Sequence, residues 1–315
     1  MRRLPPRWVT ALAAAAALTA LAACGETQEQ GSQQPQGASL RVTIGTQEFP
    51  EGRIIGELWR EALAVNGYAV DLRKGVGPAE DLDEALKDGD IDGYVAYTGT
   101  VLSIVAGEGE EVSGLDPRQT YDKAKEFYAG QDMVMSEMTP FQNKDAIATT
   151  REYSERNDLT TIADLRRVER FTLGARPEFE SLYLGLEGLQ QVYGLTNAKF
   201  ASIALGAQYA ALDNGDADAV NAFTTDPQLG SGAYVVLDDT ELLFGSQNVV
   251  MVVGEKKLSS IDADAFMAVV DAVNSQLTED AMVAMNAEVT EGRDDAAVAA
   301  SFLRDAGLME PLDLG

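Results

Sequence analysis

Two stretches of the sequence decide the fold: "ALKDGDIDGYVAYT" at residues 85–98 and "ALDNGDADAVNAFT" at residues 211–224. They match without a gap at Ala, Leu, Gly, Asp, Asp, Ala and Thr. The first stretch alone has the D-x-D-x-D-G order of a calcium loop, from Asp88 to Gly93. Such a loop needs a bidentate carboxylate at its twelfth position, which is Gly99 here. The first stretch therefore lacks the key ligand of a calcium loop, and its acidic residues belong to a unit that the chain contains twice.

Each copy of the repeat has the pattern of a helix, a turn and a strand. Apolar residues at helical spacing lead into Gly89 in the first copy and Gly215 in the second. Glycine adopts the left-handed conformation that ends a helix, so we expect strands over 91–96 and 217–222. The Asp and Asn residues beside each glycine bond locally to the backbone in such turns.

A second pair of similar segments lies upstream of the repeats, "VTIGTQEF" at 42–49 and "FTLGARPEF" at 171–179. Both have the pattern of a strand that runs through a glycine-containing loop into a helix. Alternating strands and helices favour two α/β lobes with largely parallel sheets. Ligands bind such sheets at the carboxyl ends of strands, where Tyr97 and Phe223 stand. We therefore expect a cleft between the lobes.

The first 24 residues, "MRRLPPRWVTALAAAAALTALAAC", have the layout of an export signal: basic residues, a short apolar run, then small residues. The run is too short to span a membrane as a mature helix. Its end, Leu-Ala-Ala-Cys, resembles a bacterial lipobox, which predicts cleavage before Cys24 and acylation of that cysteine. The alternative is an ordinary signal peptide with a chance cysteine. Cys24 is the only cysteine in the chain, so the protein can form no internal disulfide.

The residues after the export signal predict a folded domain that is preceded by a flexible tether. Residues 25–38 are rich in Gln, Gly, Ser and Glu, which is typical of a flexible linker. No later segment has the 18 or so consecutive apolar residues of a membrane span. The net charge of −27 argues against nucleic acid and anionic lipid headgroups as partners.

The residue types exclude most enzyme classes. The chain has no histidine, so Ser-His-Asp and Cys-His sites and histidine-bound zinc are excluded. It contains no P-loop and no G-x-S-x-G motif. A paired-carboxylate hydrolase stays open, because the chain has 51 acidic residues. We expect no cofactor and no metal.

Several segments together resemble the osmoprotectant-binding proteins of bacterial ABC importers, the receptors for glycine betaine, choline and carnitine. They include "IGTQEFPEGRIIGELWREAL" (44–63), "ALKDGDIDGYVAYTGT" (85–100) and "ALDNGDADAVNAFTTD" (211–226). The resemblance implies a two-lobed, type II periplasmic-binding-protein-like fold that closes over a small-molecule ligand. It implies an ABC permease and ATPase as partners, a monomer, and a location on the extracytoplasmic face of the bacterial membrane. A sensory lipoprotein with the same fold is the alternative.

In that family a cage of tyrosines holds a quaternary ammonium group, while a lysine, an arginine and a threonine hold the ligand's carboxylate. Aromatic faces attract a cation that has no N–H to donate, and a fork of donors suits a carboxylate. Around the matching positions the resemblance implies these ligand-binding residues: Gln47, Tyr97, Thr98, Thr100, Asn143, Asp145, Phe223 and Gln247.

This chain departs from the family's pattern at most of those positions. Tyr97 matches a cage tyrosine, and the other three cage positions hold other residues: Asp145, Phe223 and Gln247. The lysine and arginine positions carry Gln47 and Leu182. The loss of both cations disfavours a carboxylate, and Asp145 adds an acid where the cation of the ligand would lie. We therefore expect an organic cation without a carboxylate, such as choline, to bind better than glycine betaine.

The repeats also predict how the chain divides. The two copies lie in different halves, and the helical stretch at 262–277 needs a partner from the first half to cover. The expected segments are a signal peptide (1–24), a tether (25–38), a first lobe (39–142 plus 248–315) and a second lobe (143–247).

Overall fold

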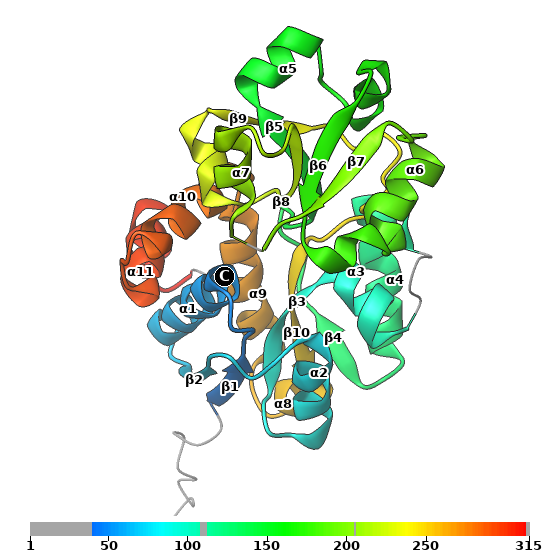
Figure 1. Cartoon of the computed structure of the whole chain (residues 1–315). Coiled ribbons are helices and arrows are strands. Elements are labelled where there is room, and N and C mark those ends of the chain that lie inside the picture. Colours follow the sequence, from blue (N-terminus) through cyan, green and yellow to red (C-terminus); the bar gives the residue numbers. More distant parts are fainter. Residues whose placement is uncertain (1–39, 108–111, 205, 313–315) are drawn as a thin grey trace, which may run out of the picture. The chain divides into compact units, whose positions relative to one another are not determined.

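The computed structural model describes residues 40–107, 112–204 and 206–312, which fold as two lobes around two β-sheets (Figure 1). The predicted signal peptide, with Cys24, and the whole of the predicted tether lie outside the described residues. No helix within the described ranges is both long and apolar enough to cross a membrane.

The two sheets have five strands each, in the same order and with the same directions. The first sheet runs β2 (Ala69–Arg73), β1 (Arg41–Gly45), β3 (Gly93–Tyr97), β10 (Val249–Gly254) and β4 (Met133–Met135). The second runs β7 (Ala198–Ser202), β6 (Phe171–Ala175), β8 (Ala219–Phe223), β5 (Asp145–Thr150) and β9 (Tyr234–Leu237). The first three strands of each sheet are parallel, whereas β10 and β5 are antiparallel to both neighbours. The sheets are thus mixed rather than largely parallel, because β5 and β10 follow segments that pass from one lobe to the other.

Helices flank both sheets. Those in the chain segments of the first sheet are α1 (Pro50–Val65), α2 (Ala79–Asp88), α3 (Thr98–Thr100), η1 (Val101–Val105), α4 (Pro117–Ala129), α8 (Glu255–Leu258), α9 (Ala263–Gln276), α10 (Glu279–Thr290) and α11 (Asp295–Asp305). Those in the segment of the second sheet are α5 (Arg151–Asn157), η3 (Ile162–Arg167), η4 (Pro177–Glu180), η5 (Tyr183–Glu187), α6 (Gly188–Val192), α7 (Gln208–Asn214) and η6 (Pro227–Ser231).

The repeated unit folds in the same way in both lobes. Helix α2 ends at Gly89 with φ 79°, and α7 ends at Gly215 with φ 74°, which confirms the left-handed glycine in each copy. The strands that follow, β3 and β8, begin two residues later than the sequence predicted. The residues just after each glycine instead turn back onto their helix, where Asp90 N and Asp216 N both donate to a helix carbonyl.

The last aspartate of each repeat completes a strand ladder. Asp92 Oδ2 accepts a hydrogen bond from Thr43 N at 2.8 Å, and Asp218 Oδ2 accepts one from Thr172 N at 2.7 Å. Both threonines lie one residue before the point where β1 and β6 begin to pair with β3 and β8. Each carboxylate therefore satisfies a strand amide that has no partner in the next strand. This is a structural role for acids that resemble a calcium loop in the sequence.

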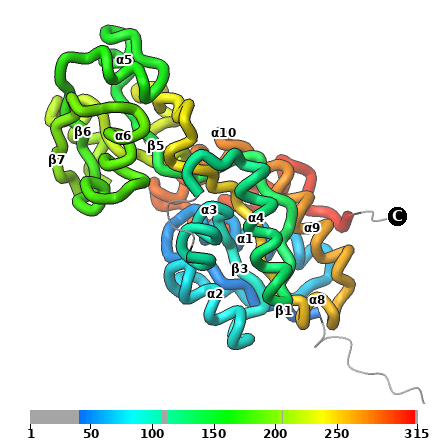
Figure 2. The backbone as a smooth tube through the Cα atoms, turned by 90° about the vertical axis from the view of Figure 1, so that its right-hand side faces the viewer, coloured from blue at the N-terminus to red at the C-terminus, as the bar shows by residue number. Residues whose placement is uncertain are grey.

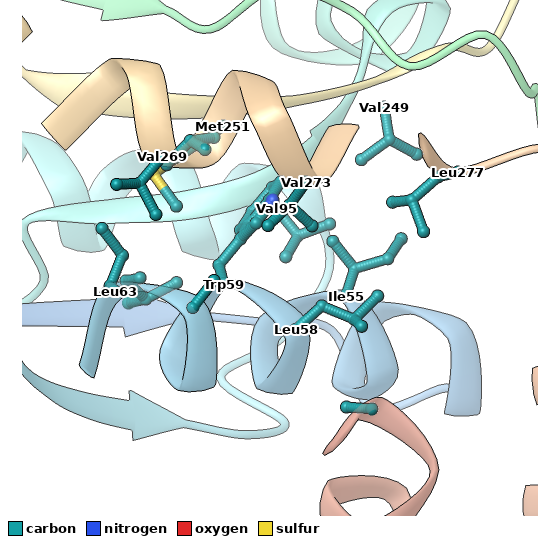
Figure 3. Packing of buried hydrophobic residues seen from close by; sticks show 14 of the residues in the cluster. Ile55, Leu58, Trp59, Leu63, Val95, Val249, Met251, Val269, Val273 and Leu277 are labelled. Atoms are coloured by element: carbon teal, nitrogen blue, oxygen red, sulfur yellow. The ribbon is translucent and has the colours of Figure 1, made fainter. Parts of the chain in front are cut away.

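Helix α1 forms the centre of the first lobe's core. Pro50 stands in its first turn, where its missing N–H costs nothing, and apolar residues recur on one face of the helix. Figure 3 shows Ile55, Leu58, Trp59 and Leu63 of α1 packed against residues of α9 and the sheet. Trp59 Nε1 also donates a hydrogen bond to Asn274 Oδ1 of α9 at 2.9 Å. The C-terminal helices thus cover the first helix of the chain.

Helix α10 contacts both lobes. It packs against α1 on one side and against η6 on the other, and Figure 2 shows it where the lobes meet. Asn286 Nδ2 of α10 donates to the carbonyl oxygen of Thr225 at 3.1 Å. This helix therefore brings side chains from the C-terminal part of the chain to the junction between the lobes.

Candidate functional site

A cavity of about 890 Å³ lies between the two lobes. Its walls come from the loop after β1 and the start of α1, the end of β3, the end of β8, and the starts of α7 and η6. The loop before α2, the segments that connect the lobes and helix α10 form the rest of the wall. The volume is within the range of small-molecule sites.

Four aromatic side chains line the cavity, two from each lobe: Phe49, Tyr97, Tyr209 and Phe223. The rings of Phe49 and Tyr97 have centroids 5.9 Å apart with an angle of 42° between their planes. Of these four residues, only Tyr97 and Phe223 were predicted from the sequence. Tyr209 lies on the apolar face of the repeat helix and Phe49 precedes Pro50, so both have the sequence context of ordinary packing residues.

Glu51, in the first turn of α1, is a buried carboxylate in the cavity wall, with 2% of its surface exposed. Its Oε1 accepts hydrogen bonds from Tyr97 Oη at 2.8 Å and Asn143 Nδ2 at 2.9 Å. Its Oε2 accepts one from Asn286 Nδ2 at 3.1 Å, and the Thr225 side chain also bonds to the carboxylate. Glu51 thus connects α1, β3, a connecting segment, α10 and the second lobe.

The surroundings of Glu51 set its charge behaviour. Burial raises the pKa of Glu51 above its ordinary value, and the hydrogen bonds from Thr225, Tyr97, Asn143 and Asn286 oppose that rise. Burial and the neighbouring Glu51 carboxylate raise the pKa of Tyr97, so its hydroxyl keeps its proton and donates. The sequence pattern did not single out Glu51, because an acid in the first turn of a helix is the ordinary partner of the helix dipole.

Asp145, at the start of β5, lines the cavity but is not an unpaired anion as the sequence analysis assumed. Arg176 Nη1 lies 2.8 Å from Asp145 Oδ1, and Nη2 lies 3.3 Å from Oδ2, so the pair is bidentate. Asn221 Nδ2 donates to the same carboxylate at 2.8 Å. The guanidinium of Arg176 also lies 5.9 Å from the centroid of the Phe223 ring. Asp145 therefore stands in the cavity wall as one half of an ion pair.

The remaining predicted residues divide into those that line the cavity and those that do not. Gln47, Thr100, Asn143 and Gln247 line it. Thr98 does not line it: its side chain is fully buried and lies 3.5 Å from the carbonyl of Ser246. Leu182, at the family's arginine position, is 40% exposed and also lies outside the wall.

Three amide side chains around the cavity are held in place by the hydrogen bonds that their nitrogens donate. Gln47 Nε2 donates to the Val95 carbonyl at 3.0 Å, and the side-chain amides of Asn143 and Asn286 donate to Glu51. The oxygens of these three amides are buried without a hydrogen-bond partner among the described residues. Each amide group is thus held through its nitrogen.

Gln247 holds the start of the turn after β3. Its Oε1 accepts from Thr100 N at 3.0 Å and from Thr100 Oγ1 at 3.3 Å. Gly99 lies directly against this segment, and a Cβ there would be 2.4 Å from the Ser246 carbonyl oxygen. The Y-T-G-T sequence thus needs its glycine because the backbone of the connecting segment passes so close.

The charged residues of the cavity wall are mainly acidic. They are Glu48, Glu51, Asp145 and Asp226, with Lys144 as the cation. Lys144 and Asp226 were not predicted from the sequence. Within the described ranges, no group of three or more His, Cys, Asp or Glu side chains is arranged to hold a metal ion.

The comparisons with known proteins agree with this geometry. The family model described as the substrate-binding domain of ABC-type glycine betaine transport systems matches residues 41–305. The glycine-betaine-binding protein of Pseudomonas aeruginosa is 28% identical over 288 residues, which cover 87% of this chain and 90% of that protein. The glycine betaine-binding protein YehZ of Escherichia coli is 25% identical over 286 residues, covering 87% of this chain and 93% of that protein.

A solved structure shows the same fold. A crystal structure described as a glycine betaine/carnitine/choline ABC transporter superposes with a TM-score of 0.77 at 21% identity, covering 85% of this chain and 100% of that chain. The family match spans most of the sequence and includes both lobes and the cavity between them. The chain therefore belongs to the family of substrate-binding domains of ABC-type glycine betaine transport systems.

Proposed function

We propose that this protein captures a small organic cation, with a quaternary ammonium or related headgroup, in the cavity between its lobes. It then delivers that ligand to an ABC permease. One observation carries the proposal: four aromatic side chains line an acidic cavity. Aromatic faces attract a cation by about 0.5 to 2 kcal/mol each, depending on how far the site is desolvated.

The charges of the cavity wall support a cationic ligand. They also change the expectation, drawn from the sequence, that the site disfavours the carboxylate of a ligand. Acids outnumber cations in the wall, and Arg176 is committed to Asp145. The ammonium group of Lys144 forms no hydrogen bond or ion pair with the residues that the structure describes. It could therefore hold a ligand carboxylate, although the lysine and arginine positions of the family are lost. Choline stays the preferred ligand in this proposal, with glycine betaine as the second candidate.

A thermal-shift screen tests the proposed function. The compounds are choline, glycine betaine, carnitine, ergothioneine, polyamines and amino acids, with 3,3-dimethylbutan-1-ol as the uncharged carbon analogue of choline. A ligand at a hundredfold excess over its Kd stabilises the folded state by about 2.7 kcal/mol. We expect at least one quaternary ammonium compound to raise the melting temperature clearly. A screen in which none does so at millimolar concentration would overturn the proposed function.

The lobes are expected to move about the two segments that connect them. We propose a first lobe of 39–142 plus 248–315 and a second lobe of 143–247. An antiparallel bridge between Gln142 and Asn248 holds the two connecting segments together at the boundary. A sensory role would use the same movement. A neighbouring permease and ATPase gene favours transport, and a neighbouring kinase gene favours sensing.

The lipid anchor is a separate proposal about the N-terminal sequence. We expect the wild-type protein to sediment with membranes, and the Cys24→Ser variant to be released into the soluble fraction, because serine cannot accept the thioether-linked lipid. Immunoblotting of both fractions measures the distribution. Equal membrane association of the two proteins would contradict the lipoprotein assignment.

A further inference from the structure

Asp226 stands in the second-lobe wall of the cavity, between the end of β8 and the start of η6. Its Oδ2 accepts two hydrogen bonds, from Tyr209 Oη at 2.8 Å and from Phe223 N at 2.9 Å. Its Oδ1 accepts none from the residues that the structure describes. Half of this carboxylate is therefore fixed by the protein, and half is left for another partner.

The other acids of the wall are occupied or exposed. Both oxygens of Glu51 already accept hydrogen bonds from neutral donors. Asp145 is paired with Arg176 in a bidentate contact. Glu48 is exposed to solvent. Among these, Asp226 combines partial burial with an oxygen that no side chain or backbone group satisfies.

We propose that Asp226 is the counter-ion that selects a positively charged headgroup in this site. The inference rests on the proposed function and deepens it by naming the residue that reads the ligand's charge. Tyr209 lines the cavity and its hydroxyl donates to Asp226 Oδ2, so an aromatic residue and the carboxylate stand side by side in the same wall. A cation between them is attracted by both groups.

The desolvation of Asp226 fits this role. Burial raises the pKa of Asp226, and the negative charge of Asp145 adds to that rise. A bound cation would restore the favourable interaction that the carboxylate loses on leaving water. The simpler alternative is that Asp226 only closes its own turn through the Phe223 amide. The counter-ion role needs the negative charge of Asp226. The turn role does not, because the amide oxygen of an asparagine at this position could accept the same two hydrogen bonds.

The test compares ligands that carry a quaternary nitrogen with carbon isosteres that lack its positive charge, on wild type and on Asp226→Asn. Asparagine keeps the shape and one acceptor oxygen for Tyr209 and Phe223, and removes the charge. The probes are choline with 3,3-dimethylbutan-1-ol, and glycine betaine with 3,3-dimethylbutanoate, in which carbon replaces the quaternary nitrogen. Calorimetry gives the Kd of each probe. Asp216→Asn is the matched control, because it removes the same charge from an exposed residue outside the cavity.

We expect Asp226→Asn to weaken binding of the quaternary ammonium member of each pair about tenfold or more. Binding of the uncharged 3,3-dimethylbutan-1-ol should change less than about twofold, and binding of the anionic 3,3-dimethylbutanoate should not weaken. The melting temperature of the variant should stay within about 3 °C of wild type. Asp216→Asn should leave every Kd unchanged.

The outcomes separate the two proposals. Wild-type binding of choline or betaine that Asp226→Asn leaves unchanged would overturn the counter-ion role alone. Equal weakening of the quaternary ammonium probes and their carbon analogues would assign Asp226 to the turn and also overturn the counter-ion role. If wild type binds neither choline nor glycine betaine nor any other quaternary compound, the proposed function fails and this inference fails with it.

Discussion

Replacing Glu51 with alanine is expected to lower the free energy of unfolding by about 3 kcal/mol, because it strands buried donors. The side chains of Tyr97, Asn143, Asn286 and Thr225 all bond to this carboxylate. Each orphaned donor costs about 1 to 3 kcal/mol, and removal of the buried charge offsets part of that loss. Urea denaturation followed by circular dichroism measures the change.

Glu61→Ala is the matched control, because it lies on the same helix. Its carboxylate pairs with Arg60 Nη2 at 2.6 Å and is 26% exposed. A pair of this kind contributes under about 1 kcal/mol, so the control should change stability little. A Glu51→Ala variant as stable as Glu61→Ala would contradict the role of Glu51 as the connecting acceptor between lobes.

The second large effect concerns the aromatic wall. The double variant Phe49→Leu/Phe223→Leu is expected to lose about 2 kcal/mol of choline affinity, roughly thirtyfold in Kd. Phe223 should contribute the larger share, because Phe49 is 39% exposed and cation–π attraction is weak at exposed sites. Leucine keeps an apolar side chain at both positions, so the loss of affinity measures the contribution of the aromatic ring faces. Calorimetric titration with choline measures it.

Phe200→Leu controls for a general effect of losing a ring. Phe200 lies on β7 in the second lobe and packs against the core rather than the cavity. Its replacement should leave the Kd for choline within about twofold of wild type. A double variant that binds choline as tightly as wild type would show that these rings do not form the cation site.

The fold follows from the sequence to a large extent, because the two repeats carry regular signals. The glycines at 89 and 215 predict the helix ends, and the strands that follow differ from the predictions only at their boundaries. The direction of β5 and β10 was not predictable in this way. It depends on how the chain passes between lobes, and no local pattern encodes that path.

The candidate site was predictable only in part. Tyr97 and Phe223 end the two repeat strands, so a periodic signal marks them. Glu51 and Tyr209 have the sequence context of a helix-dipole acid and a helix-face residue, and only the packed structure brings them to the cavity. Asp145 pairs with Arg176, which lies 31 positions further along the chain. No local pattern marks a pair at that separation, so the sequence alone predicted an unpaired acid at Asp145.

A crystal structure of the protein with bound choline tests the central claim most directly. The account predicts a closed cavity with the quaternary nitrogen within about 6 Å of the ring centroids of Tyr97 and at least one second-lobe aromatic residue, Tyr209 or Phe223. It also predicts that Asp226 Oδ1 is the carboxylate oxygen nearest to the nitrogen. Choline bound outside this cavity, or bound within it away from all four aromatic rings, would contradict the account.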